Sequence, residues 1–126
     1  MQNNRANTKW NEWCDPEQQH GFDYWYSYGT YDYHMTPMYW STDARREAFH
    51  FVKHWEPEHA ADLAIDCIRN KEGKHRRSNQ PFALVVSMNP LHTPYDQFPK
   101  KYLEFYESKT SKDLFVHPNV DIEWKN

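Results

Sequence analysis

The sequence predicts an α/β fold, and two observations carry that prediction. Between residues 57 and 71, small and aliphatic residues recur at the three- and four-residue spacing of an amphipathic helix. Residues 82–87 then form a short apolar run that ends at turn residues, as in a buried strand. Because such a strand is apolar on both faces, we expect the helix and the strand to form one αβ step of a covered sheet.

The segments before the helix predict less regular structure. Residues 1–19 are polar and show no period, so we expect them to be irregular. Residues 20–41 are dense in aromatic side chains but interrupted by glycine and proline, which indicates a packed, irregular segment with short strands. Residues 49–55 alternate weakly and predict a short strand.

The boundaries of the helix follow from its terminal residues. Pro57 suits the first helical turn, and Glu56 and Glu58 complement the positive end of the helix dipole. Gly73 is the expected stop, and a solvated basic loop follows it over residues 72–80.

Two segments follow the predicted strand. Residues 99–108 predict a short amphipathic helix that begins at a proline. The tail, residues 108–126, alternates weakly around Leu114, Val116, Val120 and Ile122. At 126 residues, there is room for one domain of ordinary size.

Composition excludes several classes of function. The net charge is −3, whereas proteins that bind nucleic acid usually have a strongly basic face, so this class of function is not indicated. No apolar run approaches the ~20 residues of a membrane helix, and the polar N-terminal residues show no secretory signal. Cys14 and Cys67 do not form a disulfide framework; their pairing stays open, although Cys67 lies on the apolar helix face and should be buried.

The balance of apolar residues is unusual. Mean hydropathy is −1.12, yet aromatic residues make up 17% of the chain. Aliphatic residues are scarce and cluster between Leu63 and Val86. We therefore expect a thin core, with many aromatic rings packed against something absent from this chain or lining a site.

The most informative candidate residue is His92, which follows the predicted strand between Pro90 and Pro94. In open α/β sheets, sites gather beyond the carboxyl ends of strands. Two stiffening prolines can present an imidazole that carries a positive charge near neutral pH. The alternative is a surface turn with an incidental histidine.

The motifs at residues 20–40, 57–66 and 81–95 together resemble those of the sulfatase family of the alkaline-phosphatase superfamily. Residues 81–95 are similar to its Asn-Pro-Pro-His-Thr-Pro-Tyr loop, with Leu91 at the second proline. Residues 20–40 are similar to its Gly-Phe-Asp block, and residues 57–66 agree as well. Order and approximate spacing fit, and the resemblance covers roughly residues 10–107.

The resemblance implies an incomplete domain with a partial alkaline-phosphatase-like sheet and flanking helices. It divides residues 1–126 into an irregular start (1–19), a matching region (20–107) and a tail (108–126). The intact relative would be a sulfuric-ester hydrolase acting on sulfated sugars or glycans. Its expected cofactors are a formylglycine nucleophile, made from a cysteine or serine in a Cys/Ser-x-Pro-x-Arg motif, and Ca²⁺, which carboxylates and an amide hold.

The resemblance also implies the roles of two residues. His92 matches the second histidine of the family, a catalytic and substrate-binding donor to a sulfate oxygen or to the bridging ester oxygen. His34 lies where the family often places substrate-facing groups, and Tyr33, Tyr39 and Trp40 would suit stacking on a sugar ring. The alternative for these aromatic residues is that they form the core.

Most of the family's machinery has no match in this sequence. Residues 14–18 mimic the nucleophile motif but end in Gln18 where arginine is required, and residues 8–11 depart from its Gly-Lys-Trp-His motif. The Asp-Asn-Gly metal motif is absent, as is the paired aspartate. Asp23 and Asp32 are possible metal ligands, but lone aspartates in turns more often cap the turn or face solvent. We therefore assign no metal ligand.

Zinc is not favoured either, since only His50 and His54 have a helical spacing, in a segment of uncertain structure.

From the resemblance and the missing motifs, we expect an internal fragment of a sulfatase catalytic domain that is inactive alone. Its expected partners are a sulfated carbohydrate and the missing parts of the domain. One alternative is a noncatalytic, aromatic-rich carbohydrate-binding module, and another is a protein-interaction remnant. The compartment stays open, although intact family members are usually periplasmic, secreted or lysosomal.

Overall fold

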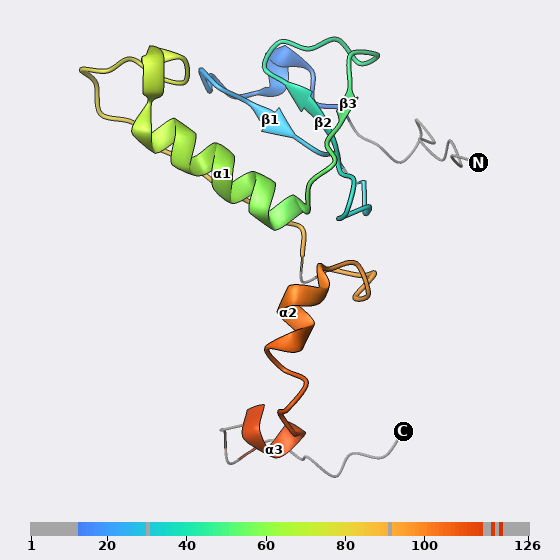
Figure 1. The fold of residues 1–126 in the computed structure, drawn as a ribbon. Helices are drawn as coiled ribbons and strands as arrows, with labels where there is room; N and C mark the ends of the chain where they lie inside the picture. Colours follow the sequence, from blue (N-terminus) through green and yellow to red (C-terminus); the bar gives the residue numbers. More distant parts are fainter. Residues whose placement is uncertain (1–12, 30, 91, 115–116, 118, 120–126) are drawn as a thin grey trace.

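The computed structural model describes residues 13–29, 31–90, 92–114, 117 and 119. Its sheet has three short antiparallel strands in the order β1 (Tyr26–Ser27), β2 (Met38–Ser41) and β3 (His50–Phe51). Tyr26 pairs with Ser41, and Met38 pairs with Phe51. Figure 1 shows this sheet beside the long helix α1 (Glu56–Arg69). Strands and helices together are compatible with part of an α/β fold.

The core is thin, as composition predicted. Across the described ranges, the buried hydrophobic side chains are those of Met38, Tyr39 and Trp40 on β2 and of Cys67 on α1. The indole Nε1 of Trp40 donates a hydrogen bond of 2.8 Å to the carbonyl oxygen of Arg46, so this polar group is satisfied inside the core. The prediction that Cys67 is buried is confirmed, and both cysteines are free thiols.

Helix α1 confirms the predicted helix, but it ends at Arg69 because Asn70 adopts the left-handed conformation. Asparagine tolerates this conformation at a helix end. The Asn70 side chain accepts hydrogen bonds of 3.2 Å from the backbone N–H groups of His75 and Arg76. Gly73, the predicted stop, instead closes the following turn of 3₁₀ helix, η2 (Lys71–Gly73).

The strand predicted at residues 82–87 is wrong for this chain, because no strand of the described structure lies beside it. The segment starts near the end of α1, where the Arg76 guanidinium lies 4.3 Å from the Phe82 ring centre and bonds the Ile68 carbonyl. It reaches the start of α1, where the Asn89 N–H donates to Glu56. From Ile68 back to Glu56, the helix spans about 18 Å. Seven residues span about 23 Å as a strand and only about 11 Å as a helix, so this segment cannot be helical and runs along α1 in an extended form.

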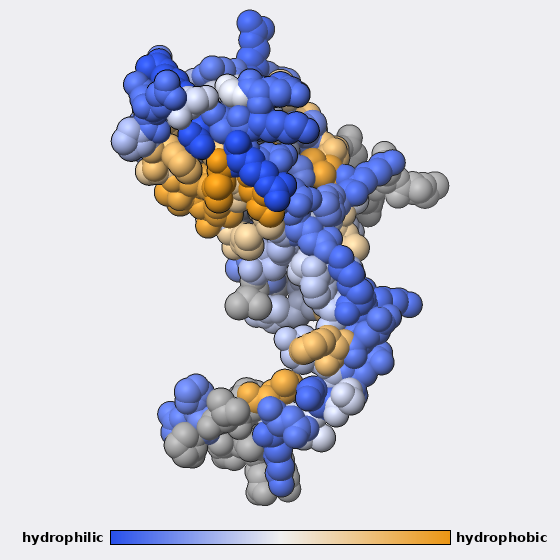
Figure 2. All heavy atoms as spheres, turned by 60° about the vertical axis from the view of Figure 1, so that its left-hand side comes forward, coloured by the Kyte–Doolittle hydropathy of each residue, from blue (hydrophilic) through white to orange (hydrophobic). Residues whose placement is uncertain are grey.

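The aliphatic side chains of this segment face solvent. Figure 2 shows hydrophobic residues gathered on one side of the upper part of the molecule. Val85 is 73% exposed, and Phe82, Leu84, Val86 and Met88 are exposed as well. On α1, Ile65 and Ile68 are also exposed. The helix and the following segment therefore keep apolar surface that the described residues leave uncovered.

Two short helices complete the described chain, α2 (Lys100–Glu104) and α3 (Ser111–Leu114). Helix α2 confirms the helix predicted at 99–108 but is shorter, while α3 lies in the tail, for which the sequence indicated only a weak alternation. The Tyr102 hydroxyl donates a bond of 2.8 Å to Glu58, and Lys101 pairs with the same carboxylate. The hydrogen bond from Lys101 is the largest factor that lowers the pKa of Glu58. These contacts tie α2 to the first turn of α1.

The segment before the sheet is mostly irregular, as predicted for residues 13–19, apart from one 3₁₀ turn, η1 (Pro16–Gln18). The Asp15 carboxylate caps this turn by accepting a 3.0 Å bond from the N–H of Glu17. Residues 1–12 lie outside the described residues, as does the Lys9-Trp10 pair. None of the helices in the described ranges is long and apolar enough to cross a membrane.

The pair Tyr26–His59 predicts a pH dependence of stability. The Tyr26 hydroxyl lies 2.8 Å from His50 Nε2 and 3.1 Å from His59 Nε2, and burial raises the pKa of Tyr26 to about 12. Burial, followed by repulsion from His54, lowers the pKa of His59 below its usual 6.5. The unfolded chain therefore binds the proton more readily, and the free energy of unfolding should fall as pH drops through about 6.5.

Urea unfolding at pH 7.5 and pH 5.5 measures this dependence. We expect His59→Gln, which keeps a polar partner for Tyr26 but does not titrate, to flatten the slope. The control is His20→Asn at an exposed histidine whose left-handed backbone suits asparagine. Equal slopes for the His59 variant and the unmodified chain would contradict the assignment.

Candidate functional site

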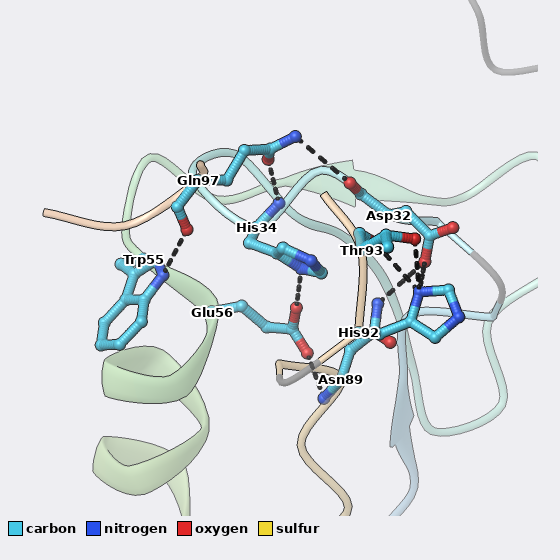
Figure 3. Close-up of polar contacts among 8 residues, drawn as sticks. All are labelled: Asp32, His34, Trp55, Glu56, Asn89, His92, Thr93 and Gln97. Atoms are coloured by element: carbon cyan, nitrogen blue, oxygen red, sulfur yellow. Dashed lines mark hydrogen bonds and ion pairs between the residues drawn. The ribbon is translucent and has the colours of Figure 1, made fainter. Parts of the chain in front are cut away.

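His92 is exposed and lies on the loop that follows the extended segment. Figure 3 shows it beside Asp32 and Thr93. Its backbone N–H donates a bond of 3.0 Å to the Asn89 carbonyl, which closes a turn. Its ring Nδ1 lies 2.9 Å from the Thr93 carbonyl oxygen. Because a carbonyl only accepts, Nδ1 carries a proton. Nε2 is therefore the ring nitrogen available to a ligand.

Asp32 connects two residues of this loop. Its Oδ1 accepts a bond of 3.0 Å from the Asn89 side-chain amide and lies 3.8 Å from His92 Nδ1. Both members of the Asp32–His92 pair are largely exposed, so their attraction adds little to stability. Its effect is to orient the ring so that Nδ1 faces the protein. The sequence indicated only a capping or solvated aspartate here.

Beneath this loop lies a buried pair of polar side chains. His34 and Glu56 are each 1% exposed, and His34 Nδ1 lies 2.9 Å from Glu56 Oε2. The other carboxylate oxygen, Oε1, accepts a bond of 3.0 Å from the Asn89 N–H. Figure 3 shows Glu56 between His34 and Asn89. Removing one partner of a buried hydrogen bond leaves the other group unsatisfied and typically costs about 1–3 kcal/mol, so this contact stabilises the fold.

Gln97 links the far end of the loop to His34 and Asp32. Its Oε1 accepts a 2.7 Å bond from the His34 N–H, and its Nε2 lies 3.5 Å from the Asp32 carbonyl oxygen. Its own carbonyl accepts a 3.0 Å bond from the Trp55 indole. The loop from Asn89 to Gln97 is thus held at both ends.

The structure separates the two histidines that the resemblance singled out. His92 faces solvent, while His34 is enclosed and bonded to Glu56. The geometry of His34 fits a positioning role, and its contact with a substrate stays a prediction. For Tyr39 and Trp40, the alternative of a core position is confirmed, since both are buried. Tyr33 is 57% exposed and lies next to Asp32 in the chain.

The described residues do not form a metal centre. No group of three or more His, Cys, Asp or Glu among them is placed to hold a metal ion. His50 lies in β3 and His54 precedes α1, so the two do not share a helix as their spacing would have allowed. The described residues therefore do not fit Ca²⁺.

Sequence reasoning missed Glu56 and Gln97 as parts of this site. Glu56 was recognised only as a complement to the helix dipole. Its partners His34 and Asn89 lie 22 and 33 residues away, and no local spacing indicates such contacts. One signal was present: Glu56 stands at the start of a helix that the sequence predicts.

Comparisons with known proteins agree with the motifs. No family model matches the chain. The chain is similar to an endo-4-O-sulfatase of Bacteroides thetaiotaomicron, with 39% identity over 119 residues, which is 92% of this chain and 23% of that protein. It is also similar to the solved structure of yidJ, a proposed sulfatase of Bacteroides fragilis. That match has 52% identity and a TM-score of 0.70, and it covers 83% of this chain and 22% of the other.

These comparisons define the class of protein that the fold and the loop resemble. The resemblance to sulfatases is confirmed over most of the chain. The chain spans less than a quarter of the length of each relative, as expected for a fragment of a sulfatase domain.

Proposed function

We propose that this chain is part of a sulfatase catalytic domain in which His92 donates a hydrogen bond to the sulfate group of a sulfated sugar or glycan. The observation that carries the proposal is the geometry of His92. Its Nδ1 is held at the Thr93 carbonyl beside Asp32, while the ring itself is exposed. This loop lies within the region similar to two sulfatases.

The chemistry follows from the available nitrogen. Hydrolysis breaks the bond between sulfur and the bridging oxygen, and negative charge grows on that oxygen and on the sulfate oxygens. A protonated imidazole whose Nε2–H points at one of these oxygens stabilises that charge in the transition state. If the oxygen is the bridging one, the same proton passes to the departing alcohol. The formylglycine nucleophile and the Ca²⁺ expected of the family would come from other parts of the protein.

Sugar as the substrate class is supported by exposed aromatic rings near this loop. Tyr33 adjoins Asp32 in the chain, and Tyr95 lies three residues after His92; both rings are exposed. Aromatic side chains commonly line ligand sites and offer flat apolar faces to a ring. Which sulfated sugar is bound would depend on residues outside this chain.

We also propose that the rest of the domain covers the apolar surface of α1 and residues 82–88. An extended segment with exposed aliphatic side chains, and with no neighbouring strand among the described residues, suits pairing with strands of another part of the protein. Because catalysis depends on positioning of groups from several segments, the chain alone should release no sulfate.

A chimera tests the proposal. The stretch of the B. thetaiotaomicron endo-4-O-sulfatase that aligns with this chain is replaced by the corresponding residues of this chain. Sulfate release from the substrate of that enzyme is then measured beside the parent enzyme and the isolated chain. We expect the chimera to retain activity within about two orders of magnitude of the parent, since a 1 Å misplacement can cost about 10²-fold. The isolated chain should be inactive.

Two results would contradict the proposal. One is a chimera that melts in a single cooperative transition near that of the parent but releases no sulfate. The other is binding of sulfated oligosaccharides by the isolated chain, followed by tryptophan fluorescence, together with an inactive chimera. That second result would favour the noncatalytic binding module.

A further inference from the structure

We propose that Glu56 and His34 form a buried positioning unit that holds Asn89 in place and thereby aims His92. The positioning itself rests on contacts within this chain. Only its consequence for turnover rests on the proposed function of His92.

The two oxygens of Glu56 have separate tasks. Oε2 lies 2.9 Å from His34 Nδ1, and Oε1 accepts the 3.0 Å bond from the Asn89 N–H. Glu56 is the first residue of α1, and its own N–H donates a bond of 2.8 Å to the His34 carbonyl. Helix α1 therefore fixes the carboxylate, and His34 is bonded to Glu56 through both its ring and its backbone.

The turn transmits this restraint to His92 by two routes. The Asn89 carbonyl accepts the His92 N–H at 3.0 Å, which fixes the backbone. The Asn89 side chain bonds Asp32, whose carboxylate lies 3.8 Å from the His92 ring. A shift of Asn89 away from Glu56 therefore disturbs both the backbone and the ring of His92.

The tautomer of His34 reports its hydrogen bond to Glu56. An ionised carboxylate only accepts hydrogen bonds, so His34 Nδ1 must donate to Glu56. His34 Nε2 is buried without a hydrogen-bond partner in the described structure. In Glu56→Gln, the side-chain amide can still accept from Asn89 through its oxygen. Its NH₂ group must then donate to His34 Nδ1, and the histidine proton must move to Nε2.

The experiment uses NMR on the full 126-residue chain. Histidine ¹⁵N shifts report the tautomer of His34, and amide hydrogen exchange reports the turn. Glu56→Ala removes both contacts, while Glu56→Gln keeps both with the proton moved. The matched control is Asp62→Asn, which removes an exposed carboxylate from the same helix.

We expect Glu56→Ala to speed exchange of the Asn89 and His92 amides by about tenfold or more, while the amides of β2 keep their protection. Glu56→Gln should retain the protection of the turn and switch His34 from the Nδ1–H to the Nε2–H tautomer. Asp62→Asn should change neither the exchange rates of these amides nor the tautomer of His34.

Three outcomes would overturn the inference. The first is unchanged exchange at Asn89 in Glu56→Ala, and the second is a uniform rise at every amide, which would assign only general stability to the pair. The third is Glu56→Gln without a tautomer switch, which remains decisive even if Glu56→Ala does not fold.

In the chimera, Glu56→Ala should lower kcat by about tenfold with a smaller change in KM. A chimera without any activity beside positive NMR results would refute the proposed function and leave the positioning unit standing.

Discussion

Replacing His92 by alanine in the active chimera is expected to lower kcat for sulfate release by about 10²–10³-fold, the usual effect of losing one donor to a developing oxyanion. The substitution removes the imidazole whose Nδ1 is bonded to the Thr93 carbonyl and whose Nε2, in the protonated ring, is the proposed donor to the sulfate. KM should change less, because the donor strengthens its bond mainly as charge grows in the transition state. Steady-state kinetics of sulfate release separate the two constants.

A second exposed histidine serves as the control for this prediction. His20→Asn lies outside the candidate site and on a backbone that asparagine tolerates, so both constants should match those of the unmodified chimera. If His92→Ala leaves kcat within about threefold, or raises KM alone, His92 does not act as a transition-state donor.

Replacing Trp40 by alanine is expected to unfold the isolated chain or leave it only partly folded. Truncating a buried Trp costs about 3–5 kcal/mol, and small domains have about 5–15 kcal/mol of stability in total. Trp40 is 4% exposed, and its indole bonds the Arg46 carbonyl, so the change opens a cavity and frees a buried acceptor. With so thin a core, the described chain has few other contacts to compensate. Urea unfolding followed by far-UV circular dichroism measures the loss.

Phe105→Ala is the matched control, because this ring is 71% exposed on the turn after α2. Its effect should stay within about 0.5 kcal/mol. A Trp40 variant whose unfolding midpoint equals that of Phe105→Ala would show that β2 does not anchor the core.

The strand predicted at residues 82–87 shows the limit of pattern reasoning most clearly. Its apolar character is real, and it occurs in a segment similar to sulfatases. A strand, however, is defined by a neighbour that pairs with its backbone, and the described residues supply none. The apolar pattern indicates which side chains favour burial. It does not indicate whether this chain contains the strand or helix that would cover them.

What the sequence determined by itself was local or motif-based: helix α1, the thin core, the short strands of residues 20–41 and the loop that resembles sulfatases at His92. These follow from periodicity, from propensity and from residue types in a fixed order. The tertiary structure decided that His34 is enclosed, that Glu56 holds both His34 and the Asn89 N–H, and that Asp32 and Gln97 secure the loop. The physical reason is that these bonds join residues 22 to 63 positions apart, and such pairings arise only when the chain packs.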